Sequence, residues 1–302
     1  MSIFNSLEEL SSRIQHVPQR VVSLVPSITE SLFDLGAGSS VVGITDYCVH
    51  PADGLARIKR VGGTRSPRME EILSLQPDLV IANQEENPRE LVEMLDKSGL
   101  TIWLIFPRSV RDTLNILWTM TDLFQLEEAV LRLRILEDAI RLAEDSLSDE
   151  PPVSYFCPIW QGEEPGQTWW MTFNDQTYPA DVLRILGGSN IFHARERRYP
   201  LDADLGMGMP EEADGRDVRY PHITLSEVID LAPEFILLPS EPYPYQREHV
   251  PQFREWFSET PAGKKNRILP VDGTYFTWHG TRLGKAIQFL GGLFRQSELE
   301  SF

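Results

Sequence analysis

One phrase of the sequence occurs twice, about half a chain apart. Residues 69–81 read MEEILSLQPDLVI, and residues 225–237 read LSEVIDLAPEFIL. Each copy predicts a short helix, a proline that ends it, an acidic residue and a buried strand. The two prolines, Pro77 and Pro233, are 233 − 77 = 156 residues apart in a chain of 302. Repetition at this spacing predicts two similar α/β lobes rather than a solenoid.

A second pair of segments supports the duplication. Residues 30–36 read ESLFDLG, and residues 181–187 read DVLRILG. Two lobes leave a cleft where they meet, and clefts between domains are favoured ligand sites. We therefore expect a ligand-binding cleft between the lobes.

Short apolar runs alternate with helical segments through both halves. Strands that are apolar throughout predict parallel sheets covered on both faces. Ser27 or Thr29 could cap the helix that follows the first strand, and Gly36 could end it. We expect strands at 21–25, 41–45, 79–82, 101–106, 153–159, 235–238 and 268–271, and helices at 69–75, 89–97, 179–186, 225–231, 249–258 and 282–294. Loops are expected at 50–68 and 195–219. Gly187-Gly188 is expected to end the helix at 179–186.

The middle of the chain predicts a helical connection. No glycine or proline occurs between Arg108 and Glu150, and apolar residues recur there at helical spacing. A turn near residues 124–125 divides the stretch, and the second helix, about 22 residues long, would span roughly 33 Å. We expect an N-terminal lobe at 1–108, a connecting helical segment at 109–150 and a C-terminal lobe at 151–302.

Composition excludes several classes of protein. A net charge of −17 argues against a nucleic-acid groove and against docking on anionic membranes. The sequence contains no stretch of 18 uncharged apolar residues, so no membrane-spanning segment is expected. The first residues lack the features of a signal peptide, which predicts a cytoplasmic protein, or a periplasmic or cell-surface one if a leader has been lost. Cys48 and Cys157 form no CxxC pair and suit a reducing compartment.

Several segments in the same order resemble a known family. These are VVSLVPSITESL (21–32), VGITDY (42–47), QPDLVIA (76–82) and LGGSNIF (186–192). Together with the mid-chain helix they resemble the cobalamin and iron-siderophore receptors of ABC importers, the helical-backbone class of substrate-binding proteins. The resemblance runs from about residue 20 to about residue 294. It implies two α/β lobes joined by the long helix, and a monomer.

A closer resemblance is to leaderless cobalamin-binding proteins or helical-backbone metal receptors. TDYCVHP (45–51), ANQEEN (82–87), CPIW (157–160) and LLPSEPY (237–243) carry it. It implies non-enzymatic capture of a metal-containing cofactor or chelate, cobalamin first and haem or a ferric siderophore next. It implies no required cofactor. No GxSxG motif and no dinucleotide fingerprint is present to indicate an enzyme.

Four residues are candidates for lining the cleft, because ligands of α/β folds sit beyond the carboxyl ends of the strands. Tyr47 matches an aromatic position that lines the cobalamin cleft, although it could instead pack against its own loop. Arg65 stands where the cobalamin receptors place an aromatic residue, which favours a ligand with a carboxylate or phosphate. Trp278 is a candidate cleft wall. Of the adjacent Trp169 and Trp170, which point to opposite faces of a strand, we favour Trp170.

Three further residues could bind a metal. Cys48 and His50 face the same way if their segment is extended, and thiolate and imidazole are ligands for zinc, iron or cobalt. His279 is the best distant third ligand. The alternative is a buried, inert cysteine beside a hydrogen-bonded histidine. If the three converge, the protein could instead be a cytosolic metal-ion binding protein or metalloenzyme.

The resemblance also implies a docking glutamate for an ABC permease on each lobe, seven residues before the repeated proline. Glu70 fits this position in the first lobe. Ser226 occupies it in the second, and Glu227 is one residue away, which rotates the carboxylate by roughly 100° on a helix. The alternative is that Glu227 reaches the partner through its flexible side chain. The pattern favours cytoplasmic sensing or storage over transport.

Overall fold

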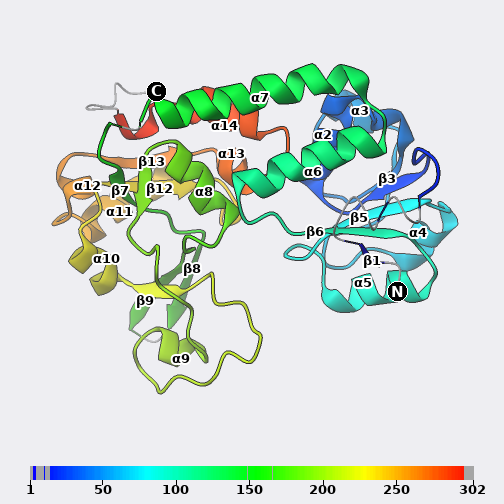
Figure 1. The fold of residues 1–302 in the computed structure, drawn as a ribbon. Helices are drawn as coiled ribbons and strands as arrows, with labels where there is room; N and C mark the ends of the chain where they lie inside the picture. Colours follow the sequence, from blue (N-terminus) through cyan, green and yellow to red (C-terminus); the bar gives the residue numbers. More distant parts are fainter. Residues whose placement is uncertain (1–2, 5–9, 11–13, 148, 165, 296–302) are drawn as a thin grey trace. The chain divides into compact units, whose positions relative to one another are not determined.

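The computed structural model describes residues 3–4, 10, 14–147, 149–164 and 166–295. The chain divides into two compact units (Figure 1): Met1–Asp138 with Trp278–Gly284, and Ala139–Thr277 with Lys285–Phe302. Each unit contains a parallel sheet with helices around it, which confirms the predicted α/β class. In the part of the chain that the structure describes, no helix is both long enough and apolar enough to cross a membrane.

The first unit is built on a six-stranded parallel sheet in the order β1-β6-β5-β2-β3-β4. Successive residues of a strand point to opposite faces, so Val21 and Val22 enter two different cores. Val21 packs with residues of α2 and α6, and Val22 packs with residues of α4 and α5. The strands are β1 Ile3–Phe4, β2 Val21–Ser23, β3 Val41–Ile44, β4 Lys59–Arg60, β5 Leu79–Asn83 and β6 Ile102–Ile105. The helices are α2 Pro26–Leu35, α3 Ala52–Leu55, α4 Met69–Ser74, α5 Arg89–Lys97 and α6 Val110–Leu123.

The start of α2 differs from the prediction. Neither Ser27 nor Thr29 caps the helix, because it begins at Pro26 and its N-cap residue is Val25. Proline suits this position, since its missing N–H would have no partner inside the helix. The helix ends as predicted at Gly36, with a φ of 104°. The segment 50–68, predicted as loop, contains the short elements α3 and β4.

The mid-chain helices agree with the prediction. α6 ends at Leu123 with Phe124 as its C-cap residue, and Gln125 turns the chain with a φ of 53°. The next helix, α7 Glu127–Asp145, is 19 residues long and continues from the first unit into the second at Asp138. This confirms the long connecting helix. A ligand cleft between the units stays a prediction.

The second unit has a four-stranded parallel sheet in the order β10-β7-β12-β13. On one face Phe156 and Ile236 pack with residues of α10 and α11. On the other, Phe294 contacts the rings of Tyr155 and Phe235, each with centroids 5.5 Å apart. The strands are β7 Val153–Phe156, β10 Gly188–Asn190, β12 Phe235–Pro239 and β13 Ile268–Val271. The helices are α8 Tyr178–Ile185, α9 Leu201–Asp204, α10 Leu225–Leu231, α11 Val250–Trp256, α12 Pro261–Lys264, α13 Thr274–Thr277 and α14 Leu283–Leu290.

An antiparallel sheet in the second unit was not predicted. It has the order β11-β9-β8, with β8 Trp160–Glu164, β9 Gln167–Met171 and β11 His222–Thr224. Gly162 lets β8 lie under the Trp169 ring, because a Cβ at this glycine would come within 2.1 Å of the ring. Gly188 was expected to end a helix and instead begins β10, after Gly187 has ended α8 with a φ of 93°.

The two repeated segments share a backbone detail. The residue before each repeated proline, Gln76 in one copy and Ala232 in the other, adopts a left-handed conformation with φ of 46° and 47°. In both copies the strand begins two residues after the proline. The same turn therefore leads from helix to strand in both units, as the repeat predicted.

Candidate functional site

Three loops of the first unit are joined at the carboxyl ends of β3, β4 and β5. Arg60 is the last residue of β4, and its Nη1 donates to the carbonyl oxygens of Thr45 and Cys48, in the loop after β3, at 2.8 and 2.7 Å. Asn87, in the loop after β5, donates from Nδ2 to the carbonyl oxygen of Thr64 at 2.8 Å. Because ligands of parallel α/β sheets bind at this edge, these loops form the candidate site of the first unit. We call the side chains of Tyr47, His50, Arg65 and Trp278 on it the loop face.

A distant segment completes the loop face. Residues 278–284 belong to the first unit although they follow α13 of the second. Asn83 Nδ2 lies 3.0 Å from His279 Nε2, and the backbone N–H of Thr281 donates to Ser31 Oγ at 3.1 Å. The rings of Trp278 and His50 meet edge to face, with centroids 6.0 Å apart. Trp278 is thereby placed beside the loop that carries Tyr47.

Tyr47 and Arg65 lie on neighbouring loops and are both exposed. Tyr47 is 62% exposed, and its ring lies over Gly63, where a Cβ would be 3.5 Å from Cε2. Arg65 is two residues beyond this glycine. An exposed aromatic ring beside a guanidinium can contact both the flat part and the acidic groups of a ligand.

Trp170 is not available as a cleft wall. It is fully buried in the core of the second unit, with ring centroids 5.3–5.9 Å from those of Trp256, Phe257 and Phe253. The sequence placed Trp169 and Trp170 correctly on opposite faces of a strand. It could not show that α11 covers the face to which Trp170 points.

The second unit presents other aromatic residues at the corresponding edge. Trp160 is 47% exposed and meets Tyr243 edge to face, with centroids 5.7 Å apart. Each lies four residues beyond the end of a parallel strand, Trp160 after β7 and Tyr243 after β12. Neither was selected from the sequence. The signal was the position of an aromatic residue just beyond a strand end, which Tyr47 shares after β3.

The predicted metal centre is wrong. Cys48 is fully buried, and its Sγ lies 3.2 Å from the hydroxyls of Thr29 and Thr45. Burial raises the pKa of its thiol, so the thiolate is disfavoured. His50 is exposed while His279 is buried, and among the described residues no group of three His, Cys, Asp or Glu side chains is arranged to hold a metal ion. The pairing assumed an extended segment at 48–50, and the structure has no strand there.

His279 is buried and hydrogen-bonded inside the first unit. Its side chain is only 7% exposed, with Nε2 4.0 Å from Glu86 Oε1. Burial lowers the pKa of His279 to about 4. The ring is therefore neutral near pH 7 and can accept a hydrogen bond from Asn83.

The two docking candidates differ in their surroundings. Glu70 is exposed on the first turn of α4. Glu227 is part of a capping box, in which its Oε2 accepts from the backbone N–H of Thr224 at 2.9 Å, and its Oε1 lies 3.5 Å from Arg195 Nε. Glu70 is the second residue of α4, and the second residue of α10 is Ser226. Glu227, the third residue of α10, therefore does not occupy the position that corresponds to Glu70.

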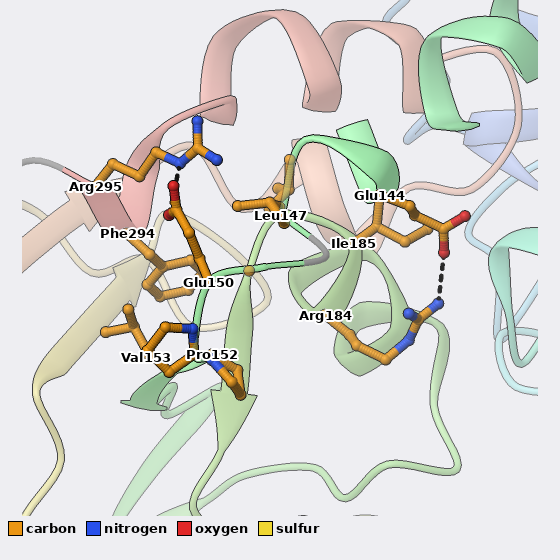
Figure 2. A pocket seen from close by; sticks show the side chains of 12 residues that line it. Glu144, Leu147, Glu150, Pro152, Val153, Arg184, Ile185, Phe294 and Arg295 are labelled. Atoms are coloured by element: carbon orange, nitrogen blue, oxygen red, sulfur yellow. Dashed lines mark hydrogen bonds and ion pairs between the residues drawn. The ribbon is translucent and has the colours of Figure 1, made fainter. Parts of the chain in front are cut away.

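A pocket of about 760 Å³ lies at the opposite edge of the second unit, beside the amino end of β7 (Figure 2). Leu147, Ile185 and Phe294 give it apolar walls. The charged groups drawn on its rim form two ion pairs, each 3.2 Å long: Arg184 with Glu144, and Arg295 with Glu150. Because these charges already neutralise each other in pairs, the loop face is the better candidate for recognising a ligand.

Comparisons with known proteins identify the family. Residues 21–273 match the periplasmic binding protein family, and the chain belongs to it. A vitamin B12-binding protein of Vibrio vulnificus is 23% identical over 270 residues, which cover 88% of this chain and 86% of the relative.

Solved structures show the same fold. The periplasmic vitamin B12-binding protein BtuF of Vibrio cholerae aligns over 93% of this chain and 98% of its own, with a TM-score of 0.72 and 19% identity. The periplasmic haem-binding protein RhuT of Roseiflexus sp. RS-1 aligns over 92% and 98%, with a TM-score of 0.70 and 22% identity. These comparisons confirm the family resemblance. They give no support to a cytosolic metalloenzyme or to a cytoplasmic location.

Proposed function

We propose that this protein is a non-enzymatic binding protein for a metal-containing macrocycle, with cobalamin as the first candidate. The exposed ring of Tyr47 on the loop face carries the proposal, since a large exposed aromatic residue at the carboxyl edge of the sheet is suited to contact a ligand. The vitamin B12-binding relatives, which align over most of their length, support the choice of cobalamin.

The chemistry of the loop face suits such a ligand. The rings of Tyr47 and Trp278 can pack against an apolar macrocycle through dispersion and burial of its surface. Arg65 adds an exposed cation to this face of an otherwise acidic protein with a net charge of −17. A guanidinium pairs well with a phosphate or carboxylate, and a cobalamin carries a phosphate.

Haem is the second candidate, and His50 favours it. Its imidazole is exposed beside Trp278, and a neutral imidazole is a common ligand of haem iron. In this alternative Arg65 would pair with a haem carboxylate. A haem-binding protein is among the solved structures with the same fold.

A titration of the purified protein with four ligands distinguishes these functions. Cyanocobalamin is followed by calorimetry, haemin by its absorbance, a ferric siderophore by tryptophan fluorescence, and zinc by calorimetry. Saturable binding of cyanocobalamin or haemin supports the proposal. Binding of zinc alone, lost in Cys48→Ser, would refute it. His50→Ala separates the two candidates, because it should change the haemin spectrum and leave cyanocobalamin binding intact.

The periplasmic relatives favour a place outside the cytoplasmic membrane over the cytoplasmic one that the sequence predicted. Docking to an ABC permease would use Glu70, because the capping box already holds the carboxylate of Glu227. Fractionation of the native host tests the location: recovery only with the cytoplasm would contradict it.

A further inference from the structure

A buried ion pair lies behind Trp278. Arg282 donates from Nε and Nη2 to the two carboxylate oxygens of Glu30, at 2.7 and 3.0 Å. The Arg282 and Glu30 side chains are 5% and 3% exposed. The guanidinium carbon of Arg282 is 4.8 Å from the centroid of the Trp278 ring. We propose that Glu30 and Arg282 are positioning residues for the aromatic wall at Trp278, a role that rests on the proposed function of the loop face.

The ion pair fixes the plane on which the indole rests. A guanidinium is a rigid fork, so two hydrogen bonds to one carboxylate determine its orientation as well as its place. A cation this close to the face of a tryptophan is attracted to the ring. Glu30 belongs to α2, which is buried along most of its length. The helix therefore fixes Glu30, Glu30 fixes the guanidinium of Arg282, and the guanidinium fixes the indole ring that lies against it.

Hydrogen bonds to α2 hold the backbone of the segment, while the edge of the Trp278 ring contacts His50. Thr281 donates from its N–H to Ser31 Oγ at 3.1 Å and from Oγ1 to Asp34 Oδ2 at 2.7 Å. Both partners are also on α2. The backbone after Trp278 is therefore anchored independently of Arg282, and loss of the ion pair should free the indole without releasing the segment.

Stability alone does not account for a charged pair at this position. Replacing a buried ion pair with apolar side chains of similar size is often neutral or stabilising, whereas removing one partner is costly. A pair that orients a ligand-contacting ring has a role that apolar side chains cannot take over. This difference makes the proposal testable by comparing both kinds of substitution.

The first test needs no ligand. The protein is labelled with 5-fluorotryptophan, which gives one ¹⁹F resonance for each of its seven tryptophans, and Trp278→Phe identifies the resonance of Trp278. The variants are Glu30→Gln, the double variant Glu30→Leu/Arg282→Met, and Arg282→Lys, which keeps the charge. The matched control is Asp204→Asn, which breaks the buried ion pair of Asp204 with Arg195 (2.9 Å) in the second unit.

We expect the Trp278 resonance to shift or broaden in Glu30→Gln and in the double variant, and less in Arg282→Lys. In Asp204→Asn the Trp278 resonance should stay in place, and the Trp169 resonance should shift. Asp204 is hydrogen-bonded to His222, and the ring centroids of His222 and Trp169 are 4.8 Å apart. An unchanged Trp278 resonance in both pair variants would overturn the proposal. So would an equal shift in the Asp204→Asn control. The single substitutions keep the test decisive if the double variant fails to fold.

The second test measures the affinity of each variant for cyanocobalamin and for haemin. The double variant should bind the ligand of the wild-type protein about threefold to thirtyfold more weakly, the range expected for a lost cation–π contact. Asp204→Asn should bind as the wild type does. Unchanged affinity in the double variant with a shifted Trp278 resonance would refute the role in binding. If the wild type binds neither ligand, the proposed function fails, and the ¹⁹F result still decides whether the ion pair positions Trp278.

Discussion

The side-chain amide of Asn83, at the end of β5, lies 3.0 Å from Nε2 of His279, which is 196 residues further along the chain. Both residues are buried. The neutral imidazole accepts the hydrogen bond from Asn83 and ties the segment that carries Trp278 to the sheet of the first unit. The position of Trp278 on the loop face therefore depends on the buried hydrogen bond of its neighbour His279.

Acidification should weaken the protein through His279. Its pKa is lowered to about 4 by burial, against about 6.5 in an unfolded chain. Between these values the unfolded state binds a proton that the folded state does not, so the free energy of unfolding falls as the pH drops from about 6.5 to about 4. The full contribution is on the order of 3 kcal/mol. Urea unfolding at a series of pH values measures it.

The control for this prediction is an exposed histidine. His279→Asn should be less stable than the wild type at pH 7 and should show a weaker fall toward pH 4. His193→Asn should keep the wild-type pH dependence, since His193 is exposed. A wild-type dependence in His279→Asn would show that another group is responsible.

Removal of either ring from the loop face should weaken ligand binding. For Tyr47→Ala and Trp278→Ala we expect losses of about 1 to 3 kcal/mol, or factors of about five to a hundred and fifty in affinity. The melting temperature of Tyr47→Ala should change little, because this ring is 62% exposed. Calorimetric titration and thermal unfolding give the two quantities. Unchanged affinity with a lowered melting temperature would assign that ring to the core.

Two tryptophans of the second unit should respond in opposite ways. Trp170→Ala should lower the free energy of unfolding by about 3 to 5 kcal/mol, since the ring is fully buried. Trp160→Ala should cost little stability, because its ring is 47% exposed. Denaturant unfolding and titration of both variants test the assignment. A ligand-affinity defect in a stable Trp170→Ala protein would restore the original prediction for Trp170.

The two docking candidates should differ in stability. Glu227→Ala removes half of the capping box at Thr224 and should cost about 1 kcal/mol. Glu70→Ala should be nearly neutral, as its side chain is exposed at the start of α4. Denaturant midpoints of both variants check this difference. Equal midpoints would show that the capping box contributes nothing measurable.

Much of the fold could be predicted because the repeat is local in sequence. Helix, proline and strand follow one another within 13 residues, and a left-handed residue before Pro77 and Pro233 makes the same turn in both copies. Helices α5 and α10 and strand β13 have the predicted bounds. The antiparallel sheet was missed because β8 carries two glutamates and a glycine rather than an apolar run.

The candidate site was predicted less well, because burial depends on which helix covers a face. The family resemblance selected Tyr47, and Trp278 was selected as a cleft wall beside His279; their contact with a ligand stays a prediction. The sequence could not show that α11 covers Trp170, or that Cys48 points inward between two threonines. The ion pair of Glu30 and Arg282 joins residues 252 apart, and no local pattern marks such a pair.

Calorimetric titration of the wild-type protein with cyanocobalamin, followed by mass spectrometry of the recovered ligand, tests the proposed function most directly. We predict saturable binding of one ligand per chain, weakened in Tyr47→Ala, with the cobalamin recovered chemically unchanged. Saturable binding of haemin but not of cyanocobalamin, weakened in the same way in Tyr47→Ala, would still fit a macrocycle-binding protein. Absence of binding to both ligands, or recovery of a chemically altered one, would contradict the proposal.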